Sequence, residues 1–190
     1  ELAGRFQQRM LSIVAIGAWV LDEACRQAQA WRQSGWPDLA MSVNLSALQF
    51  RRAGLIETVA SALKRSGLPP HLLELELTES ILLQDVENNL DTVRKLKALG
   101  VRLSIDDFGT GYSSLGYLRR LPIDTVKMDR TLIADIADDP AQISFVSAIL
   151  RLIESVGLRT VVEGIETAEQ AIMLQQLGCR YAQGHHFSEP

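Results

Sequence analysis

The chain repeats one pattern, in which an amphipathic helix is followed by a glycine and then by a short apolar strand. Ile56, Val59 and Leu63 share one helical face, and Gly67 follows as a stop signal. The pattern predicts further helices at 14–34, 85–100, 139–157 and 167–178. Strands that alternate with helices predict an α/β fold with a parallel sheet, either doubly wound or closed into a barrel.

Six apolar segments follow these glycines and are predicted to be strands. They lie at 40–45, 72–78, 102–106, 125–128, 159–163 and 181–185. The chain has 190 residues, of which 47% are hydrophobic, and contains no long linker or low-complexity stretch. We therefore expect a single domain spanning 1–190.

Polar side chains stand at the carboxyl end of each predicted strand. They are Asn44, Glu76, Asp106, Lys127, Glu163 and Gln183. The carboxyl ends of parallel strands form the sites of barrels and open α/β sheets, so these groups are expected to converge. Clustered carboxylates repel one another unless a cation compensates them. Oxygen ligands of this kind suit Mg²⁺ or Mn²⁺.

The adjacent pair Asp106-Asp107 is the most informative of these positions. Neighbouring residues on a strand point to opposite faces, so both carboxylates reach one cavity only if the strand ends there. The following Phe108-Gly109 suggests that it does. A bridging aspartate would then hold two metal ions roughly 3.5–4 Å apart, the spacing used in phosphoester hydrolysis.

Charge and cysteine content exclude several other classes. The net charge is −4 and no basic run stands out, which argues against a nucleic-acid polymer as partner. Cys25 and Cys179 form no short-spaced pair, so neither a zinc site nor a disulfide is expected. The apolar run Ile13–Leu21 is too short to span a bilayer, and we expect a cytoplasmic domain without membrane contact, whatever anchors a longer protein.

Seven segments of the chain stand out together: Val43–Ser46, Leu75–Ser80, Asp106–Leu115, Leu121–Asp124, Lys127–Arg130, Val162–Thr167 and Gln183-Gly184. In these segments, and in family order from about Ile16 to Pro190, the chain resembles the EAL domain family of cyclic di-GMP phosphodiesterases. The resemblance implies a modified (β/α)₈ TIM-like barrel whose first strand is antiparallel. It also implies hydrolysis of cyclic di-GMP to linear pGpG, two Mg²⁺ or Mn²⁺ ions, a homodimer, and sensory or cyclase domains in a longer protein.

Roles for individual residues also follow from the resemblance. Asn44, Glu76, Asp106 and Glu163 match ligands of the first metal, and Asp106 and Asp107 match the bridge and the ligand of the second. Lys127 matches the group that orients the attacking water, and Glu163 shares in activating that water. Glu166 and Gln183 complete the inner hydrogen-bond network, and Glu79 matches the anchor of the loop 107–114.

The chain departs from the family at both ends. The Glu-Ala-Leu signature is absent, and Glu1–Ser12 reads as a separate short helix. Either a segment is missing from the sequence near Gln8–Ile13, which we expect, or the protein lacks the first strand. The sequence stops at Pro190, before the family's last strand and helix. The alternatives to a hydrolase are a non-catalytic cyclic di-GMP receptor and, more remotely, an unrelated metal-dependent barrel enzyme.

Overall fold

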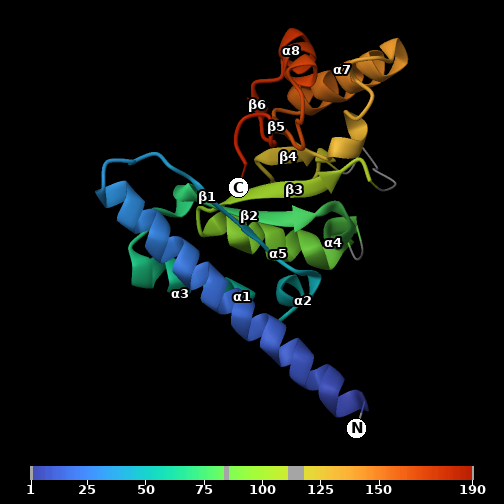
Figure 1. The fold of residues 1–190 in the computed structure, drawn as a ribbon. Helices are drawn as coiled ribbons and strands as arrows, with labels where there is room; N and C mark the ends of the chain where they lie inside the picture. Colours follow the sequence, from blue (N-terminus) through green and yellow to red (C-terminus); the bar gives the residue numbers. More distant parts are fainter. Residues whose placement is uncertain (1, 84–85, 111–117, 190) are drawn as a thin grey trace. The chain divides into compact units, whose positions relative to one another are not determined.

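A computed structural model describes residues 2–83, 86–110 and 118–189 of the chain (Figure 1). The chain divides into two compact units. Unit 1 comprises Glu1–Leu77 and Ile81–Leu103, and unit 2 comprises Thr78–Ser80 and Ser104–Pro190. The strand order in the sheet is β1-β2-β3-β4-β5-β6, which follows the order of the strands in the sequence.

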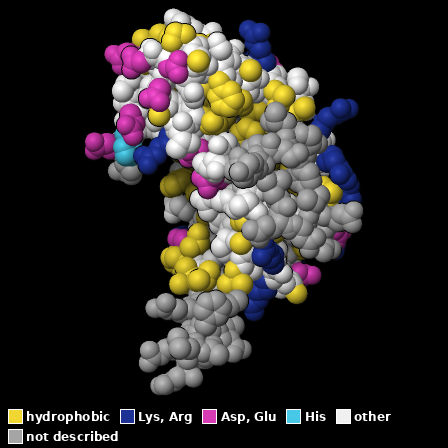
Figure 2. Space-filling model, turned by 90° about the vertical axis from the view of Figure 1, so that its right-hand side faces the viewer, with side chains coloured by type: hydrophobic (Ala, Val, Ile, Leu, Met, Phe, Trp, Pro, Cys, Tyr) yellow, Lys and Arg dark blue, Asp and Glu magenta, His cyan; other side chains and the backbone are white. Residues whose placement is uncertain are grey.

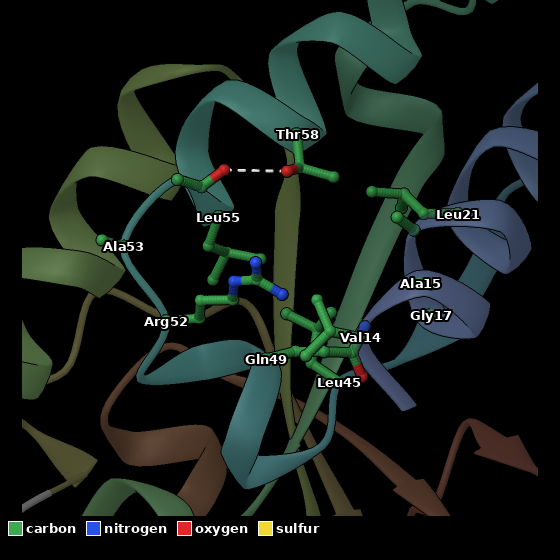
Figure 3. A pocket seen from close by; sticks show the side chains of 12 residues that line it. Val14, Ala15, Gly17, Leu21, Leu45, Gln49, Arg52, Ala53, Leu55 and Thr58 are labelled. Carbon is green, nitrogen blue, oxygen red and sulfur yellow. Dashed lines mark hydrogen bonds between the residues drawn. The ribbon is translucent and has the colours of Figure 1, made fainter. Parts of the chain in front are cut away.

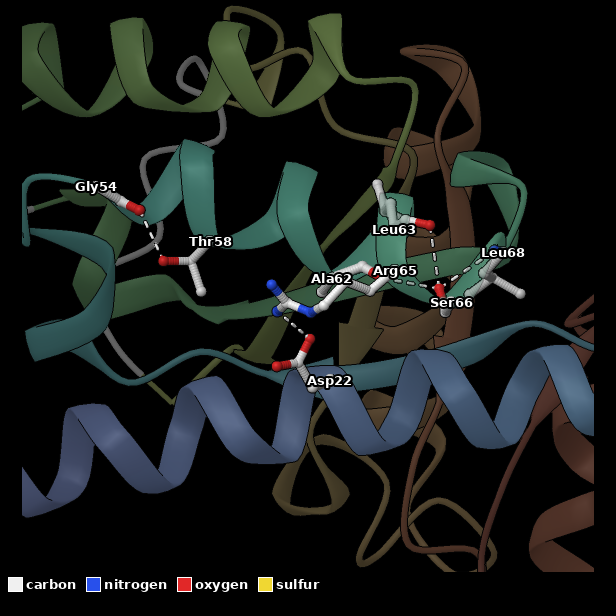
Figure 4. A network of polar contacts seen from close by, with 8 residues as sticks. All are labelled: Asp22, Gly54, Thr58, Ala62, Leu63, Arg65, Ser66 and Leu68. Atoms are coloured by element: carbon white, nitrogen blue, oxygen red, sulfur yellow. Dashed lines mark hydrogen bonds and ion pairs between the residues drawn. The ribbon is translucent and has the colours of Figure 1, made fainter.

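Unit 1 is built from helices around the first parallel strand pair. Its elements are α1 (Leu2–Gln33), β1 (Met41–Asn44), α2 (Ala47–Phe50), α3 (Leu55–Ser66), the 3₁₀ turn η1 (Pro70–Leu72), β2 (Leu73–Thr78), α4 (Glu79–Leu83) and α5 (Val86–Ala98). The last residue of β2 and the first two residues of α4, Thr78–Ser80, belong to unit 2. Helix α1 packs along α3, and Asp22 and Arg65 form an ion pair between them (Figure 4). Leu21, Val59 and Leu75 are almost completely buried in this core.

Unit 2 contains parallel strands that alternate with helices. It contains most of β3 (Arg102–Phe108), then β4 (Thr125–Met128), the 3₁₀ turn η2 (Arg130–Leu132), α7 (Pro140–Ser155), β5 (Arg159–Val162), α8 (Ala168–Gln176) and β6 (Tyr181–Ala182). The pairs β3–β4, β4–β5 and β5–β6 are all parallel. Asp139 caps α7 through the backbone N–H of Ala141, and Thr167 and Gln170 form a capping box at α8. These caps are those that the sequence predicts.

The structure confirms a parallel α/β fold and all six predicted strands. It corrects two details. The separate short helix expected in 1–12 and the helix expected from Val14 are one continuous helix, α1, because no glycine or proline interrupts 5–16. Strand β6 ends at Ala182, so Gln183 and His185 lie beyond it. The helix cap expected at Asp85 lies outside the described residues, and the single-domain expectation stays a prediction.

Hydrophobic side chains also reach the surface (Figure 2), and five large exposed ones lie on the part of α1 whose side chains are described: Ile13, Ile16, Trp19, Val20 and Trp31. Despite the length of α1, no helix in the described part of the chain is both long and apolar enough to cross a membrane.

Cys25 lies in the core of unit 1 with none of its surface exposed. Burial, with a smaller contribution from the Asp22 carboxylate, raises the pKa of the Cys25 thiol to about 11. Only the thiolate reacts with alkylating reagents. We therefore expect iodoacetamide at pH 8 to modify half-buried Cys179 first, and Cys25 at least tenfold more slowly until urea unfolds the protein. Peptide mass spectrometry measures both rates, and equal rates in the native protein would contradict this placement.

Candidate metal and phosphodiester site

In unit 1, two predicted ligands lie side by side on neighbouring strands, one at the end of β1 and the other two residues before the end of β2. Asn44 ends β1 and is the register partner of Glu76 in β2. The backbone N–H of Leu45 donates to the carbonyl of Glu76 at 2.9 Å, which extends the pairing by one bond. Glu76 is 5% exposed, whereas Asn44 is exposed. An amide oxygen and a carboxylate are thus presented together at the carboxyl edge of this strand pair.

In unit 2, strand β3 contains a bulge at the predicted metal-bridging pair. Ile105 pairs with Val126 and Phe108 pairs with Met128, so Asp106 and Asp107 together lie opposite the single residue Lys127. Asp107 adopts φ 56°, a left-handed conformation that is rare for residues other than glycine. The strand therefore does not end at Asp106, as the sequence suggested, but continues to Phe108. A bulge changes the direction of side chains locally, which removes the strict alternation of Asp106 and Asp107.

Lys127 is the centre of a cluster of charged side chains in unit 2. Its ammonium lies 2.5 Å from the Oε1 atom of Glu163 and 3.6 Å from the Oδ1 atom of Asp106, and its side chain is only 10% exposed. The Nε2 atom of Gln183 donates to Glu163 Oε1 at 2.7 Å. Burying an ammonium is costly unless carboxylates compensate it, and the contacts with Glu163 and Asp106 supply that compensation to Lys127. Four of the predicted residues are thereby brought into direct contact.

A cavity of about 410 Å³ opens beside this cluster. Its lining residues are Asp129, Arg130, Glu163, Gly164, Glu166, Gln183, Gly184, His185 and Ser188. Glu166 lines the cavity with a side chain that is 63% exposed, and its Oε1 atom lies 4.0 Å from the Nη1 atom of Arg130. The structure therefore places Glu166 at the open side of the cavity, in contact with Arg130.

Glu79 contacts the start of the loop that follows β3. It is 7% exposed, and its Oε2 atom accepts a hydrogen bond of 3.4 Å from the backbone N–H of Gly109. Residues 111–117 of the expected loop lie outside the described residues. The contact with Gly109 is consistent with the predicted anchoring role of Glu79, which stays a prediction.

The acidic groups around Asp107 influence one another. Burial of its carboxyl group, together with the negative charges of Asp106 and Asp129, raises the pKa of Asp107 above its usual range, against the opposing effect of Lys127. Asp129 shows the reverse: burial opposes ionisation, but hydrogen bonds from Thr131 and the charge of Arg130 lower its pKa. The site thus concentrates negative charge that a cation would stabilise.

The donor chemistry at this site fits a divalent cation. Asp106, Asp107 and Glu163 offer hard carboxylate oxygens, which Mg²⁺ and Mn²⁺ prefer. Within the described ranges, no three His, Cys, Asp or Glu side chains gather closely enough to form a metal site by themselves. Here the positive charge between Asp106 and Glu163 is supplied by the Lys127 ammonium.

Sequence reasoning missed two residues of this site, Asp129 and Arg130. Both follow directly after β4 and line the cavity, and Asp129 caps η2 by accepting from the backbone N–H of Thr131 at 2.9 Å. Their position after a strand was the available signal, since charged residues at that point of a parallel sheet face its functional edge.

A second cavity, of about 460 Å³, lies within unit 1 between α1, α2 and α3 (Figure 3). Val14, Leu21, Leu45 and Leu55 contribute to its apolar lining. Among the described residues that line it, Arg52 is the one charged side chain and none is a carboxylate. The described lining of this cavity therefore offers no carboxylate oxygen to a divalent cation.

The chain matches the model of the EAL domain family over residues 5–190. It is 49% identical over 178 residues to the bifunctional diguanylate cyclase/cyclic di-GMP phosphodiesterase MucR of Pseudomonas aeruginosa. The aligned region covers 94% of this chain and 26% of MucR. It is 42% identical over 172 residues to the cyclic di-GMP phosphodiesterase NbdA of the same organism, covering 90% of this chain and 22% of NbdA. The chain thus spans about a quarter of the length of these relatives.

Solved structures show the same fold. A complex of the MucR phosphodiesterase with c-di-GMP superposes with a TM-score of 0.91 at 47% identity, covering 98% of this chain and 75% of that chain. The EAL domain of DcpA from Mycobacterium smegmatis superposes with a TM-score of 0.87 at 40% identity, covering 94% of this chain and 80% of that chain.

Proposed function

The chain belongs to the EAL domain family, and from that premise we propose that it is a metal-dependent phosphodiesterase that hydrolyses cyclic di-GMP to linear pGpG. Its relatives MucR and NbdA are named as cyclic di-GMP phosphodiesterases. The observation that carries the proposal is the contact cluster of Lys127 with Asp106 and Glu163, which is oriented by Gln183. A buried ammonium among carboxylates suits a reaction in which negative charge develops on a phosphodiester.

The proposed cofactors are two Mg²⁺ or Mn²⁺ ions. Asp106 and Asp107 would hold them together with Glu163, and Asn44 and Glu76 are proposed as further oxygen ligands. When bound, such ions supply Lewis acidity for in-line displacement at phosphorus.

The residues of the chain carry the remaining chemistry. Lys127 orients the attacking water and offsets charge on the phosphodiester, and Glu163 accepts the proton of that water. Gln183 holds Glu163 by donating to its Oε1 atom. Glu166 extends the polar network at the cavity, where Arg130 contacts it, and Glu79 fixes the start of the loop after β3 through Gly109.

The proposed partners follow the same logic. Cyclic di-GMP is the substrate, and a homodimer is proposed as the active assembly, which light scattering of the purified protein would measure. Because the chain spans about a quarter of its relatives, sensory or cyclase domains are proposed as neighbours in a longer protein. The cytoplasm, where a nucleotide second messenger is available, is the proposed compartment.

The direct test is hydrolysis by the purified protein. The protein is incubated with cyclic di-GMP and about 5–10 mM Mg²⁺ or Mn²⁺, so that the metal ion is in roughly a thousandfold excess over micromolar enzyme. We expect conversion of cyclic di-GMP to pGpG, and we expect EDTA to abolish this conversion. Anion-exchange chromatography separates substrate from product, and binding is measured in parallel by calorimetry. Binding without pGpG would reject the hydrolase and favour a cyclic di-GMP receptor. Neither binding nor turnover would reject both functions.

A further inference from the structure

Two hydroxyl groups are buried in unit 2 without a hydrogen-bond partner among the described residues. They belong to Ser104, which is 0% exposed, and Thr125, which is 1% exposed. Most buried polar atoms in folded proteins have at least one partner, in the protein or in ordered water. A buried hydroxyl that makes no hydrogen bond destabilises the fold, whereas alanine or valine would fill the same space without that cost.

The two hydroxyls are neighbours. Ser104 in β3 is the register partner of Thr125 in β4, and paired strands lie about 4.8 Å apart. Neither side chain uses the other as a partner. Two hydroxyls on adjacent strands, each with unused donor and acceptor capacity, are suited to share a third polar molecule between them.

The pair lies one layer beneath the charged cluster. Side chains two residues apart on a regular strand point to the same face, so Thr125 shares its face with Lys127. Ser104 is the register partner of Thr125 and points to that face as well. The bulge begins at Asp106, and the contact of its carboxylate with Lys127 places that carboxylate on the same side. Asp106 and Lys127 are themselves paired at 3.6 Å. The two hydroxyls therefore lie directly beneath the Lys127–Asp106 ion pair, on the same face of the sheet.

We propose that Ser104 and Thr125 jointly bind one buried water molecule beneath the Lys127–Asp106 ion pair, and that they thereby act as positioning residues for these two side chains. A water molecule has two donors and two acceptor sites, and buried waters commonly make about three hydrogen bonds. Two of these satisfy the hydroxyls, and the remaining capacity faces the layer above. The water thus fixes the packing under Lys127 and Asp106 in a way that apolar side chains would not.

A crystal structure of the protein tests the site directly. We expect density for one water within about 2.7–3.2 Å of both Ser104 Oγ and Thr125 Oγ1. The water should be lost in Thr125→Val and kept in Thr125→Ser. Absence of this water from the unsubstituted protein would overturn the proposal, whether or not the protein hydrolyses cyclic di-GMP.

Thermal unfolding gives a second readout with opposite signs for the two cases. If the hydroxyls bind water, Thr125→Val or Ser104→Ala removes a satisfied partner, and Tm falls by about 2–4 °C. If the hydroxyls are unsatisfied, the same variants remove a destabilising group and Tm rises. Thr160→Val on β5 is the control, because it makes the same replacement at a half-buried position that is not part of the Ser104–Thr125 pair.

The positioning role is tested by enzyme kinetics, and this test rests on the proposed function, the hydrolysis of cyclic di-GMP. Thr125→Val is expected to lower kcat about tenfold with KM unchanged within twofold, as for other groups that orient a site from behind. Thr125→Ser should restore kcat, and Thr160→Val should leave it unchanged. An unchanged kcat in Thr125→Val would reject the positioning role. If the unsubstituted protein makes no pGpG, the proposed function fails, while the crystallographic and thermal results still decide the water site.

Discussion

Substituting Asp106→Asn is expected to reduce hydrolysis of cyclic di-GMP by at least a thousandfold. Asparagine keeps the shape of aspartate but removes its negative charge and replaces one oxygen donor with an amide nitrogen. Asp106 lies 3.6 Å from the Lys127 ammonium and begins the bulge opposite it, so charge and metal coordination are lost at the same point. Product formation with saturating Mn²⁺ measures turnover, and calorimetry with Mn²⁺ alone should show weaker metal binding.

Asp135→Asn is the matched control, because it makes the same replacement at an exposed position outside the site. Its turnover and Mn²⁺ affinity should equal those of the unsubstituted protein. Wild-type turnover in Asp106→Asn would refute the bridging role. Circular dichroism of both variants would separate a loss of chemistry from a loss of structure.

Replacing Gly184 by alanine is expected to destabilise unit 2 by on the order of 3 kcal/mol. The new methyl group would collide with the backbone of Ile165, which cannot move aside as a flexible side chain can. A Cβ atom at Gly184 would lie 2.2 Å from the carbonyl oxygen and 2.3 Å from the nitrogen of Ile165. Backbone hydrogen bonds from Ile165 to Gln183 and from His186 to Ile165 hold this contact on both sides. Urea denaturation measures the loss, and turnover should fall as well, because Gln183 orients Glu163.

Gly178→Ala separates crowding from backbone strain. Gly178 has φ 87°, so alanine there adopts a left-handed conformation, but its Cβ would meet no atom within 4 Å. The expected cost is about 1–2 kcal/mol. If both variants lost the same stability, close packing on Ile165 would not be the reason for glycine at position 184.

The regular elements were predictable because local chemistry specifies them. Strand β4 has the predicted bounds, Thr125–Met128, and the capping box of Thr167 and Gln170 forms as expected. The polar strand ends were also predictable in part, since the carboxyl ends of parallel strands were expected to bring Asp106 and Lys127 together. The structure confirms that these two side chains meet.

The remaining features depend on information that no local pattern contains. The continuity of α1 through 8–13 was missed because a break in family resemblance was taken for a break in the helix. The bulge was missed because the backbone angle at Asp107 depends on pairing with β4, not on neighbouring residues. The contact of Arg130 with Glu166 joins segments far apart in sequence, and nothing in the sequence around either residue predicts it.

The bulge in β3 also changes how this stretch of sequence should be counted. Over the span in which β4 advances by two residues, from Val126 to Met128, β3 advances by three, from Ile105 to Phe108. Two carboxylates therefore share a single rung of the ladder opposite one ammonium. Deleting either aspartate would equalise the two strands and leave one acid per rung, whereas substituting it would keep the mismatch. A design that grafts this pair onto a regular strand of equal length would separate the two acids onto opposite faces.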